Sequence, residues 1–232
     1  MKRPEIVAHR GVPRELRENT LASFARALEV GADAIELDVH VTRDGAVVVH
    51  HDAALHSVTA GVERPLIADL TLHDVRTLTP GDRPVATLHE VLELVGTFAT
   101  VYVEIKAPAA TDAVVAVLGA HPTPTAVHAF DHRVARRVRE LDPQRPTGVL
   151  MGSYLLDPLV PVEQTGARDL WQEVSMIDAV LVESAHAAGA RVVAWTVNCL
   201  ETAARLTAWG VDALCTDMAP MFAAHFGVPR RA

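Results

Sequence analysis

The chain repeats one pattern along most of its length: a short run rich in β-branched residues, then an alanine-rich stretch with helical spacing. Seven strand-like runs are readable, at residues 6–8, 34–39, 101–105, 126–129, 147–150, 191–195 and 211–215. Eight such units over 232 residues average 29 residues each, a normal size for a βα unit. The pattern therefore predicts a TIM (β/α)8 barrel, with a doubly wound open sheet as the runner-up.

The barrel needs an eighth strand within residues 166–180, where the pattern does not place one. Residues 178–188 fit either a strand at 179–182 or a helix. Because Leu181, Ala185 and Ala188 share a helical stripe, we predict a helix there.

Two local features have clear boundary signals. A helix is expected to begin after Asn19 and Thr20, which are good cap residues, and to end at Gly31. Asp44-Gly45 is a strong hairpin signal between two strand-like runs. Strand 34–39 is therefore expected to continue into a hairpin that ends at His50-His51.

Composition limits the class of protein. The chain has 21 Lys and Arg against 29 Asp and Glu, a formal charge of −8, and no basic run, which argues against nucleic-acid binding. No apolar stretch approaches the ~20 residues of a membrane span, so we expect no membrane insertion. No apolar signal region precedes the first strand-like run, and Cys199 and Cys215 are too few for a disulfide framework. We expect a single domain over residues 1–232, in the cytoplasm.

The first strand-like run ends in His9-Arg10-Gly11. In a barrel the carboxyl ends of the strands face the active site, so this pair is placed to meet an anion. Gly11 permits a tight turn and close approach by a ligand. The alternative is a salt bridge at the barrel mouth beside a packed histidine.

Glu36 and Asp38 share one face of strand 34–39, opposite Ile35, Leu37 and Val39. The apolar face is expected to pack on helices, which turns both carboxylates into the barrel. Like charges there need a cation, and oxygen ligands suit Mg²⁺ or Ca²⁺. The alternative is that the carboxylates face helices or solvent beside arginines.

Glu104 and Lys106 have the same spacing at the end of strand 101–105. Glu104 would complete a three-carboxylate metal site, and Lys106 offers a point charge for a phosphate. A simple structural Glu-Lys pair is the alternative.

Histidines supply candidate proton-transfer groups. His50-His51 follows the hairpin, and because the two alternate faces, only one can look into the site. His128 and His132 flank Phe130, and one of them is a candidate for the barrel mouth, without an assigned role.

Two residues near the end of the chain also have open alternatives. Trp195 closes strand 191–195 and can pack either on the carbon skeleton of a small ligand or in the core. Asp217 follows the last strand, where capping of a helix near Met218 is a common use of aspartate.

These segments together resemble the glycerophosphodiester phosphodiesterase family, with the densest agreement over residues 6–52. The landmarks that carry the resemblance are Ala8-His9-Arg10-Gly11, Glu18–Phe24, Gly31–Val39, Thr42–Gly45, Val48–Asp52, Thr87–Leu92, Glu104–Lys106, Trp195–Asn198 and Gly210–Asp217.

The resemblance implies a TIM barrel that hydrolyses glycerophosphodiesters to sn-glycerol 3-phosphate and a free alcohol, using one divalent cation, Mg²⁺ or Ca²⁺. By position, His9 and His51 match the family's acid–base pair. The matching metal carboxylates are Glu36, Asp38 and Glu104, and the matching phosphate-binding cations are Arg10 and Lys106.

The chain departs from the family pattern in two places. Arg17 stands where the family often has proline, and the segment between Asp52 and Leu88 is short. The family's insertion domain is therefore expected to be reduced to a loop, which leaves the head-group preference open.

Two other functions fit the same barrel. A phospholipase D-like enzyme that releases cyclic phosphates is disfavoured by the absence of a secretion signal and of a disulfide pattern. A non-catalytic barrel that binds glycerophosphodiesters is disfavoured because such a sensor needs no acid–base pair.

Overall fold

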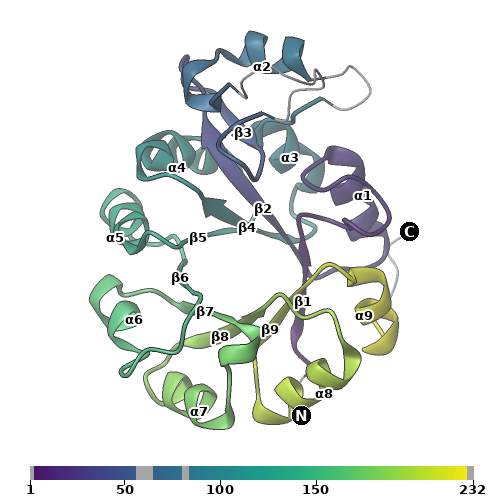
Figure 1. Ribbon diagram of the computed structural model, residues 1–232, viewed down its shortest axis with the longest axis vertical. Coiled ribbons are helices and arrows are strands. Elements are labelled where there is room, and N and C mark those ends of the chain that lie inside the picture. Colours follow the sequence, from purple (N-terminus) through teal and green to yellow (C-terminus); the bar gives the residue numbers. More distant parts are fainter. Residues whose placement is uncertain (1–2, 56–64, 80–83, 229–232) are drawn as a thin grey trace.

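A closed ring of parallel strands forms the centre of the computed structural model, which describes residues 3–55, 65–79 and 84–228 (Figure 1). The ring closes because β1 (Glu5–His9) pairs in parallel with both β2 (Ala34–Val41) and β9 (Ala213–Thr216). The strands follow the order β1-β2-β4-β5-β6-β7-β8-β9 around the barrel. The predicted TIM barrel is confirmed, and the open-sheet alternative is excluded.

Helices surround this ring, and short connections join them to the strands (Figure 1). The remaining strands are β3 (Val47–Val49), β4 (Thr100–Ile105), β5 (Thr125–Ala129), β6 (Thr147–Met151), β7 (Asp169–Glu173) and β8 (Arg191–Trp195). The α-helices are α1 (Leu21–Glu29), α2 (Leu72–Leu78), α3 (Leu88–Val95), α4 (Thr111–Gly119), α5 (His132–Leu141), α6 (Val160–Thr165), α7 (Ala179–Ala187), α8 (Leu200–Trp209) and α9 (Ala219–His225). Among the described residues, the 3₁₀ turns are η1 (Ile67–Asp69), η2 (Pro108–Ala110) and η3 (Val174–Met176). No helix in the described part of the chain is long and apolar enough to span a membrane.

The strand that the sequence pattern could not place is β7, and α7 confirms the predicted helix. In β7, Leu170 packs outward with the helices and Trp171 packs inside the barrel. Asp169 and Gln172 flank this apolar pair, so the segment shows neither a continuous apolar run nor a clear alternation. The last strand begins two residues later than expected because the Val211 amide closes the turn after α8, donating to the Leu206 carbonyl at 3.1 Å.

The predicted start of α1 is confirmed, whereas its end precedes the predicted Gly31, because Val30 is the cap residue. The Thr20 side chain accepts a hydrogen bond from the Ser23 amide, which satisfies one of the free donors at the helix start. The helix ends at Glu29, and Gly31 takes the positive φ of 89° that the following turn needs.

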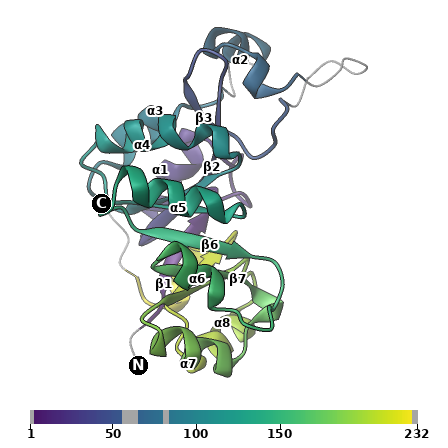
Figure 2. The same ribbon diagram turned by 90° about the vertical axis from the view of Figure 1, so that its left-hand side faces the viewer.

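The predicted hairpin is also present, and it carries a small structure of its own. β3 pairs antiparallel with β2, and Gly45 has a φ of 87° in the connecting turn. Beyond the hairpin, η1 and α2 lie at one end of the molecule, apart from the barrel (Figure 2). They bury Val48, Leu55, Ile67, Val75 and Val85 in a separate cluster. Residues 65–79 of the short insertion are thus more than a loop, and residues 56–64 and 80–83 lie outside the described residues.

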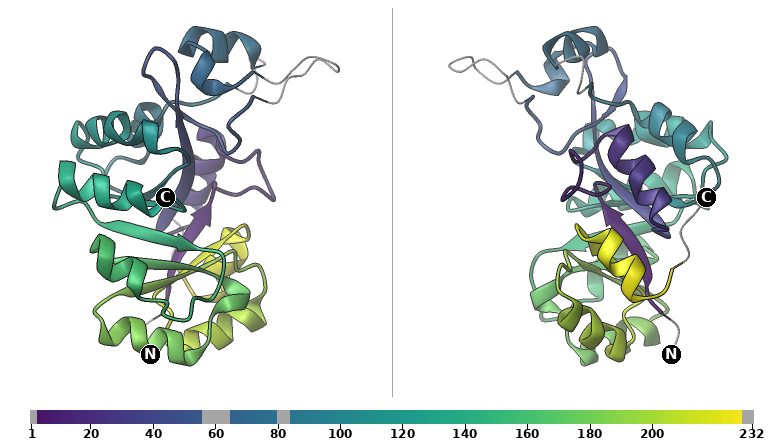
Figure 3. Two further views of the ribbon diagram at one scale, coloured as in Figure 1. Left: turned by 60° about the vertical axis from the view of Figure 1, so that its left-hand side comes forward. Right: turned by 90° about the vertical axis from the view of Figure 1, so that its right-hand side faces the viewer.

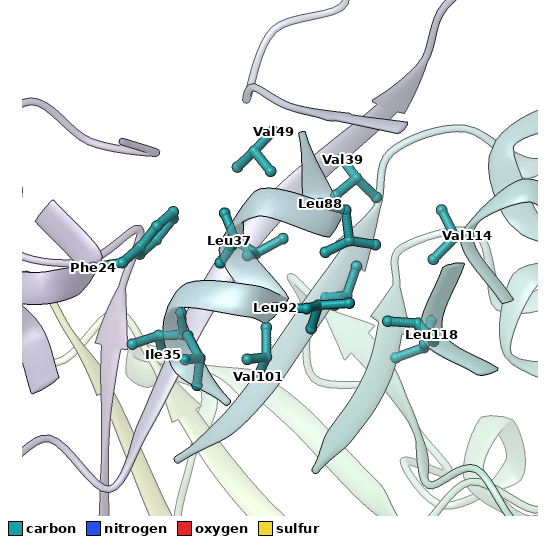
Figure 4. Close-up of a cluster of buried hydrophobic side chains, with 14 of the residues drawn as sticks. Phe24, Ile35, Leu37, Val39, Val49, Leu88, Leu92, Val101, Val114 and Leu118 are labelled. Carbon is teal, nitrogen blue, oxygen red and sulfur yellow. The ribbon is translucent and has the colours of Figure 1, made fainter. Parts of the chain in front are cut away.

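The apolar core has an outer and an inner part. Outside the ring, side chains of β2 and β4 pack against α1, α3 and α4 (Figure 4). The last described helix, α9, lies beside β1, the first strand (Figure 3). Inside the ring, one layer is apolar and consists of Val7, Ala34, Tyr102, Ala126, Leu150, Trp171, Val193, Ala213 and Cys215.

Gly148 in β6 makes room inside the barrel for two rings from its neighbouring strands. The Trp171 and His128 rings stack with centroids 4.1 Å apart and planes inclined by 4°. A Cβ added at Gly148 would lie 2.7 Å from Trp171 Cδ1 and 3.2 Å from the His128 Cβ. These distances are too short for any side chain larger than hydrogen.

We expect Gly148→Ala to lower the free energy of unfolding by about 1–3 kcal/mol, because overpacking forces the two rings apart. Chemical denaturation followed by Trp fluorescence measures this change. Gly152→Ala is the matched control, since a Cβ at Gly152 would meet nothing within 4 Å. Equal stability of the two variants would contradict the close packing described here.

Candidate active site

The predicted site residues gather at the carboxyl ends of the strands, around a cavity of about 160 Å³. It is lined by His9, Arg10, Glu36, His51, Glu104, Lys106 and Trp195, together with His128, Phe130, Leu150, Trp171, Thr196 and Cys215. Asp38 is the one predicted residue that does not line the cavity, because it lies fully buried below Arg10 and Lys106. One cavity therefore joins residues from all parts of the chain.

The turn after β1 aims Arg10 into this cavity. Arg10 has a φ of 53°, in the left-handed region that few non-glycine residues adopt. Its amide donates to the Glu36 carbonyl at 2.9 Å, and its own carbonyl accepts from the Asn19 amide at 3.0 Å. Gly11 must be glycine, because a Cβ there would lie 2.8 Å from the Ser23 backbone.

Two cations surround the Asp38 carboxylate. Arg10 Nε lies 3.1 Å from Asp38 Oδ2, and Lys106 Nζ lies 3.4 Å from Oδ1. The Asn19 amide nitrogen also donates to Oδ2 at 2.9 Å. Burial alone would raise the pKa of Asp38, but the charges of Arg10 and Lys106 outweigh it and hold that pKa below its ordinary value.

A second cluster, of two carboxylates and one imidazole, lies beside Asp38 and its two cations. Glu36, Glu104 and His128 each offer one ligand atom, and these atoms all lie within 4.8 Å of one another. All three side chains are buried. Burial and the nearby Asp38 charge raise the pKa of Glu104, although Lys106 Nζ donates to its Oε1 at 2.7 Å. Two cations thus face three buried carboxylates, an excess of negative charge.

The donor set fits a divalent cation. Glu36 and Glu104 present oxygens to the same point, and oxygen ligands are those that Mg²⁺ and Ca²⁺ prefer. The buried Asp38 Oδ1 lies 3.4 Å from Lys106 Nζ, a long ion pair, so within the described residues this oxygen has no close hydrogen bond and retains ligand capacity. The close group contains His128 in place of the predicted third carboxylate, and membership of Asp38 in the ligand set stays a prediction.

His9 is oriented by Asp217 at the end of β9. His9 Nδ1 and Asp217 Oδ1 lie 2.7 Å apart, and His9 Nε2 lies 3.9 Å from Glu36 Oε2. Asn198 holds the other Asp217 oxygen at 2.8 Å. Burial alone lowers the pKa of His9, but the hydrogen bond that His9 donates to Asp217 and the charge of Glu36 raise it above the ordinary value.

This arrangement corrects one expectation from the sequence. Asp217 does not cap the last helix, because the cap residue of α9 is Met218, whose amide donates to Thr216 Oγ1 at 2.9 Å. The carboxylate turns instead toward the barrel mouth and His9. Burial would raise the pKa of Asp217, but the hydrogen bond to His9 lowers it overall.

His51 and Trp195 form other parts of the cavity wall. His51 Nδ1 lies 2.7 Å from Asp52 Oδ1, whereas His50 is buried beside the cavity and contacts the Asp52 carbonyl through its Nδ1. Trp195 meets Phe130 edge to face, with ring centroids 5.5 Å apart. The wall therefore combines an oriented imidazole with two apolar rings.

His128 and Asp217 are the residues that sequence reasoning left without a role. In β5, Ala126 and His128 alternate inward, and His128 pairs in register with Glu104 of β4. Alternation along that strand could have indicated an inward His128, as it did for Glu36 and Glu104. No local signal indicates the pairing of Asp217 with His9, which are separated by 208 residues.

Comparison with known proteins agrees with this geometry. A phosphodiesterase from Oleispira antarctica, solved in complex with the product sn-glycerol-3-phosphate, superposes with a TM-score of 0.88 at 26% identity, over 97% of each chain. The glycerophosphodiester phosphodiesterase of Thermotoga maritima gives a TM-score of 0.82 at 27% identity, over 97% of this chain and 99% of the other.

Sequence comparison gives the same family. A glycerophosphodiester phosphodiesterase from Caldanaerobacter subterraneus is 32% identical over 91% of this chain and 93% of its own length. The model of the Glycerophosphoryl diester phosphodiesterase family matches residues 9–220. This match covers all of the cavity residues described above, and the chain belongs to the glycerophosphoryl diester phosphodiesterase family.

Proposed function

We propose that this phosphodiesterase hydrolyses glycerophosphodiesters to sn-glycerol 3-phosphate and a free alcohol, with one divalent cation and with His9 and His51 as the acid–base pair. The observation that carries the proposal is the meeting of two imidazoles, two cations and buried carboxylates in one cavity. The product bound to the Oleispira antarctica relative supports the same substrate class.

Arg10 and Lys106 would bind the phosphate group of the substrate. Both line the cavity, and both already lie beside carboxylates that keep them charged. Burial alone lowers the pKa of Lys106, but Glu104 and Asp38 raise it above its ordinary value, so the ammonium stays protonated at neutral pH. The two cations would neutralise the non-bridging oxygens as charge develops on them.

Glu36, Glu104 and Asp38 would hold the divalent cation. When bound, such an ion supplies Lewis-acid polarisation of the phosphate and a template for its orientation. For the protein itself, the benefit would be electrostatic, because a cation held by these carboxylates would offset the burial and the Asp38 charge that raise the pKa of Glu104.

His9 and His51 would move the two protons of the reaction. Each has its Nδ1 beside a carboxylate, Asp217 or Asp52, which fixes the ring and leaves Nε2 as the atom that exchanges a proton. One imidazole would take the proton of the nucleophile, and the other would protonate the departing alcohol oxygen. Trp195 would pack on the carbon skeleton of the substrate.

We expect His9→Ala and His51→Ala each to lower turnover of glycerophosphocholine by at least ~10²-fold, since each removes one proton-transfer group. Release of sn-glycerol 3-phosphate measures the loss, and circular dichroism checks the fold. His225→Ala is the control, because His225 is exposed on α9. Full activity in either active-site variant would overturn the assignment.

Metal removal tests the carboxylate site. Exhaustive treatment with EDTA should abolish release of sn-glycerol 3-phosphate and leave the secondary structure intact, and a divalent cation should restore activity. If activity survives complete removal of the metal, verified by elemental analysis, the protein is still a phosphodiesterase, but the metal-binding role proposed for Glu36, Asp38 and Glu104 is rejected.

Asp217→Asn should lower the pKa of His9, because it removes the negative charge and the carboxylate acceptor that raise it. Nitrogen NMR of the metal-free protein measures this pKa directly. Turnover should also fall, by roughly tenfold or more, since the ring loses the group that fixes its tautomer. An unchanged His9 titration would show that Asp217 does not orient the imidazole.

A further inference from the structure

The mechanism above gives no task to His128, although this histidine lies in the centre of the site. Its side chain is 1% exposed, and it lines the cavity together with Glu36 and Glu104. His128 Nε2 lies 3.6 Å from Glu36 Oε1. This distance exceeds that of a hydrogen bond and leaves room for a shared ion between the two atoms.

The packing around His128 fixes the direction of its ring. Trp171 stacks flat on one face of the imidazole, and the edge of Tyr102 approaches it with ring centroids 6.4 Å apart. Gly148, on the strand between those of His128 and Trp171, leaves the space that the stack needs. A preorganised ring of this kind loses little freedom when it binds a ligand.

The ring nitrogens of His128 are not occupied by other groups. Nδ1 is buried without a hydrogen-bond partner in residues 3–55, 65–79 and 84–228, and Nε2 lies 3.6 Å from the Glu36 carboxylate, beyond hydrogen-bond distance. A histidine that served packing alone would normally pair its polar atoms, as His132 does through Nε2 with the Leu150 carbonyl. Nε2 is therefore available to a ligand in the cavity.

We propose that His128 Nε2 is a nitrogen ligand of the active-site cation, together with oxygens of Glu36 and Glu104. A nitrogen donor beside two carboxylates favours first-row transition metal ions over Mg²⁺ and Ca²⁺, which prefer oxygen-only sites. The site thus selects an ion such as Mn²⁺, Co²⁺ or Zn²⁺. This inference rests on the divalent cation of the proposed function and specifies its coordination.

The test uses Mn²⁺ as the probe and electron paramagnetic resonance as the readout, independently of turnover. Pulsed measurements on Mn²⁺ bound to the metal-depleted wild-type protein should show nitrogen modulation of the electron spin echo, and this modulation should change when histidine is labelled with ¹⁵N. His128→Gln should lose the modulation. The variant should also bind Mn²⁺ about tenfold or more weakly than the wild type. Its affinity for Mg²⁺, measured by displacement of Mn²⁺, should fall much less.

His132→Gln is the matched control, since it makes the same change four residues away outside the cavity lining, and it should behave as the wild type. Two results would reject His128 as a ligand but retain the metal site. One is that Mn²⁺ binds to the wild type without histidine modulation, and the other is that the modulation is unchanged in His128→Gln. Failure of the wild type to bind Mn²⁺, Mg²⁺ or Ca²⁺ at all would instead overturn the metal dependence of the proposed function. If His128→Gln does not fold, His9→Ala and His51→Ala should keep the wild-type modulation, and its loss in either variant would overturn the assignment to His128.

Discussion

Burial of three carboxylates at one end of the barrel is the constraint on which the rest of the site depends. Glu36, Asp38 and Glu104 are each at most 8% exposed, and charges so placed destabilise a protein unless other groups neutralise them. Arg10 and Lys106 supply two positive charges, and His128 and His9 lie within 4 Å of Glu36. These three groups therefore hold Arg10 and Lys106 in place and set the charge around His9 and His128.

The opposite end of the barrel shows how a purely structural charge cluster differs. Arg191 bonds Glu5 at 2.6 Å and the Tyr102 hydroxyl at 3.2 Å, and it lies 3.5 Å from Asp169. The Tyr102 hydroxyl in turn donates to Glu5 at 3.1 Å. These groups satisfy one another. At the carboxyl end, Arg10 Nε and Asp38 Oδ1 take part in ion pairs of 3.1 Å and 3.4 Å, whereas His128 Nδ1 lacks a hydrogen-bond partner within the described chain. An unpaired buried polar atom beside a cavity is typical of a site that awaits a ligand.

Much of this arrangement follows from local sequence patterns, because alternation along a strand decides which side chains enter the barrel. Glu36, Asp38 and Glu104 could be assigned to the interior since their neighbours Ile35, Leu37 and Ile105 are apolar and pack on helices. The position of β7 could not, because its outward Leu170 and inward Trp171 stand between polar residues. The partner of His9 was also beyond prediction, because Asp217 reaches it only through the β1–β9 pair that closes the ring. The partner of His128 was too, because Trp171 lies on β7, the strand that the sequence pattern could not place.

A crystal structure of the protein with sn-glycerol 3-phosphate and Mn²⁺ tests the central claim most directly. We expect the phosphate to lie between Arg10 and Lys106 and the glycerol carbons to pack against Trp195. The Mn²⁺ ion, identified by its anomalous signal, should be bound by Glu36 and Glu104. A phosphate bound away from these two cations, or an ion bound away from the buried carboxylates, would contradict this claim.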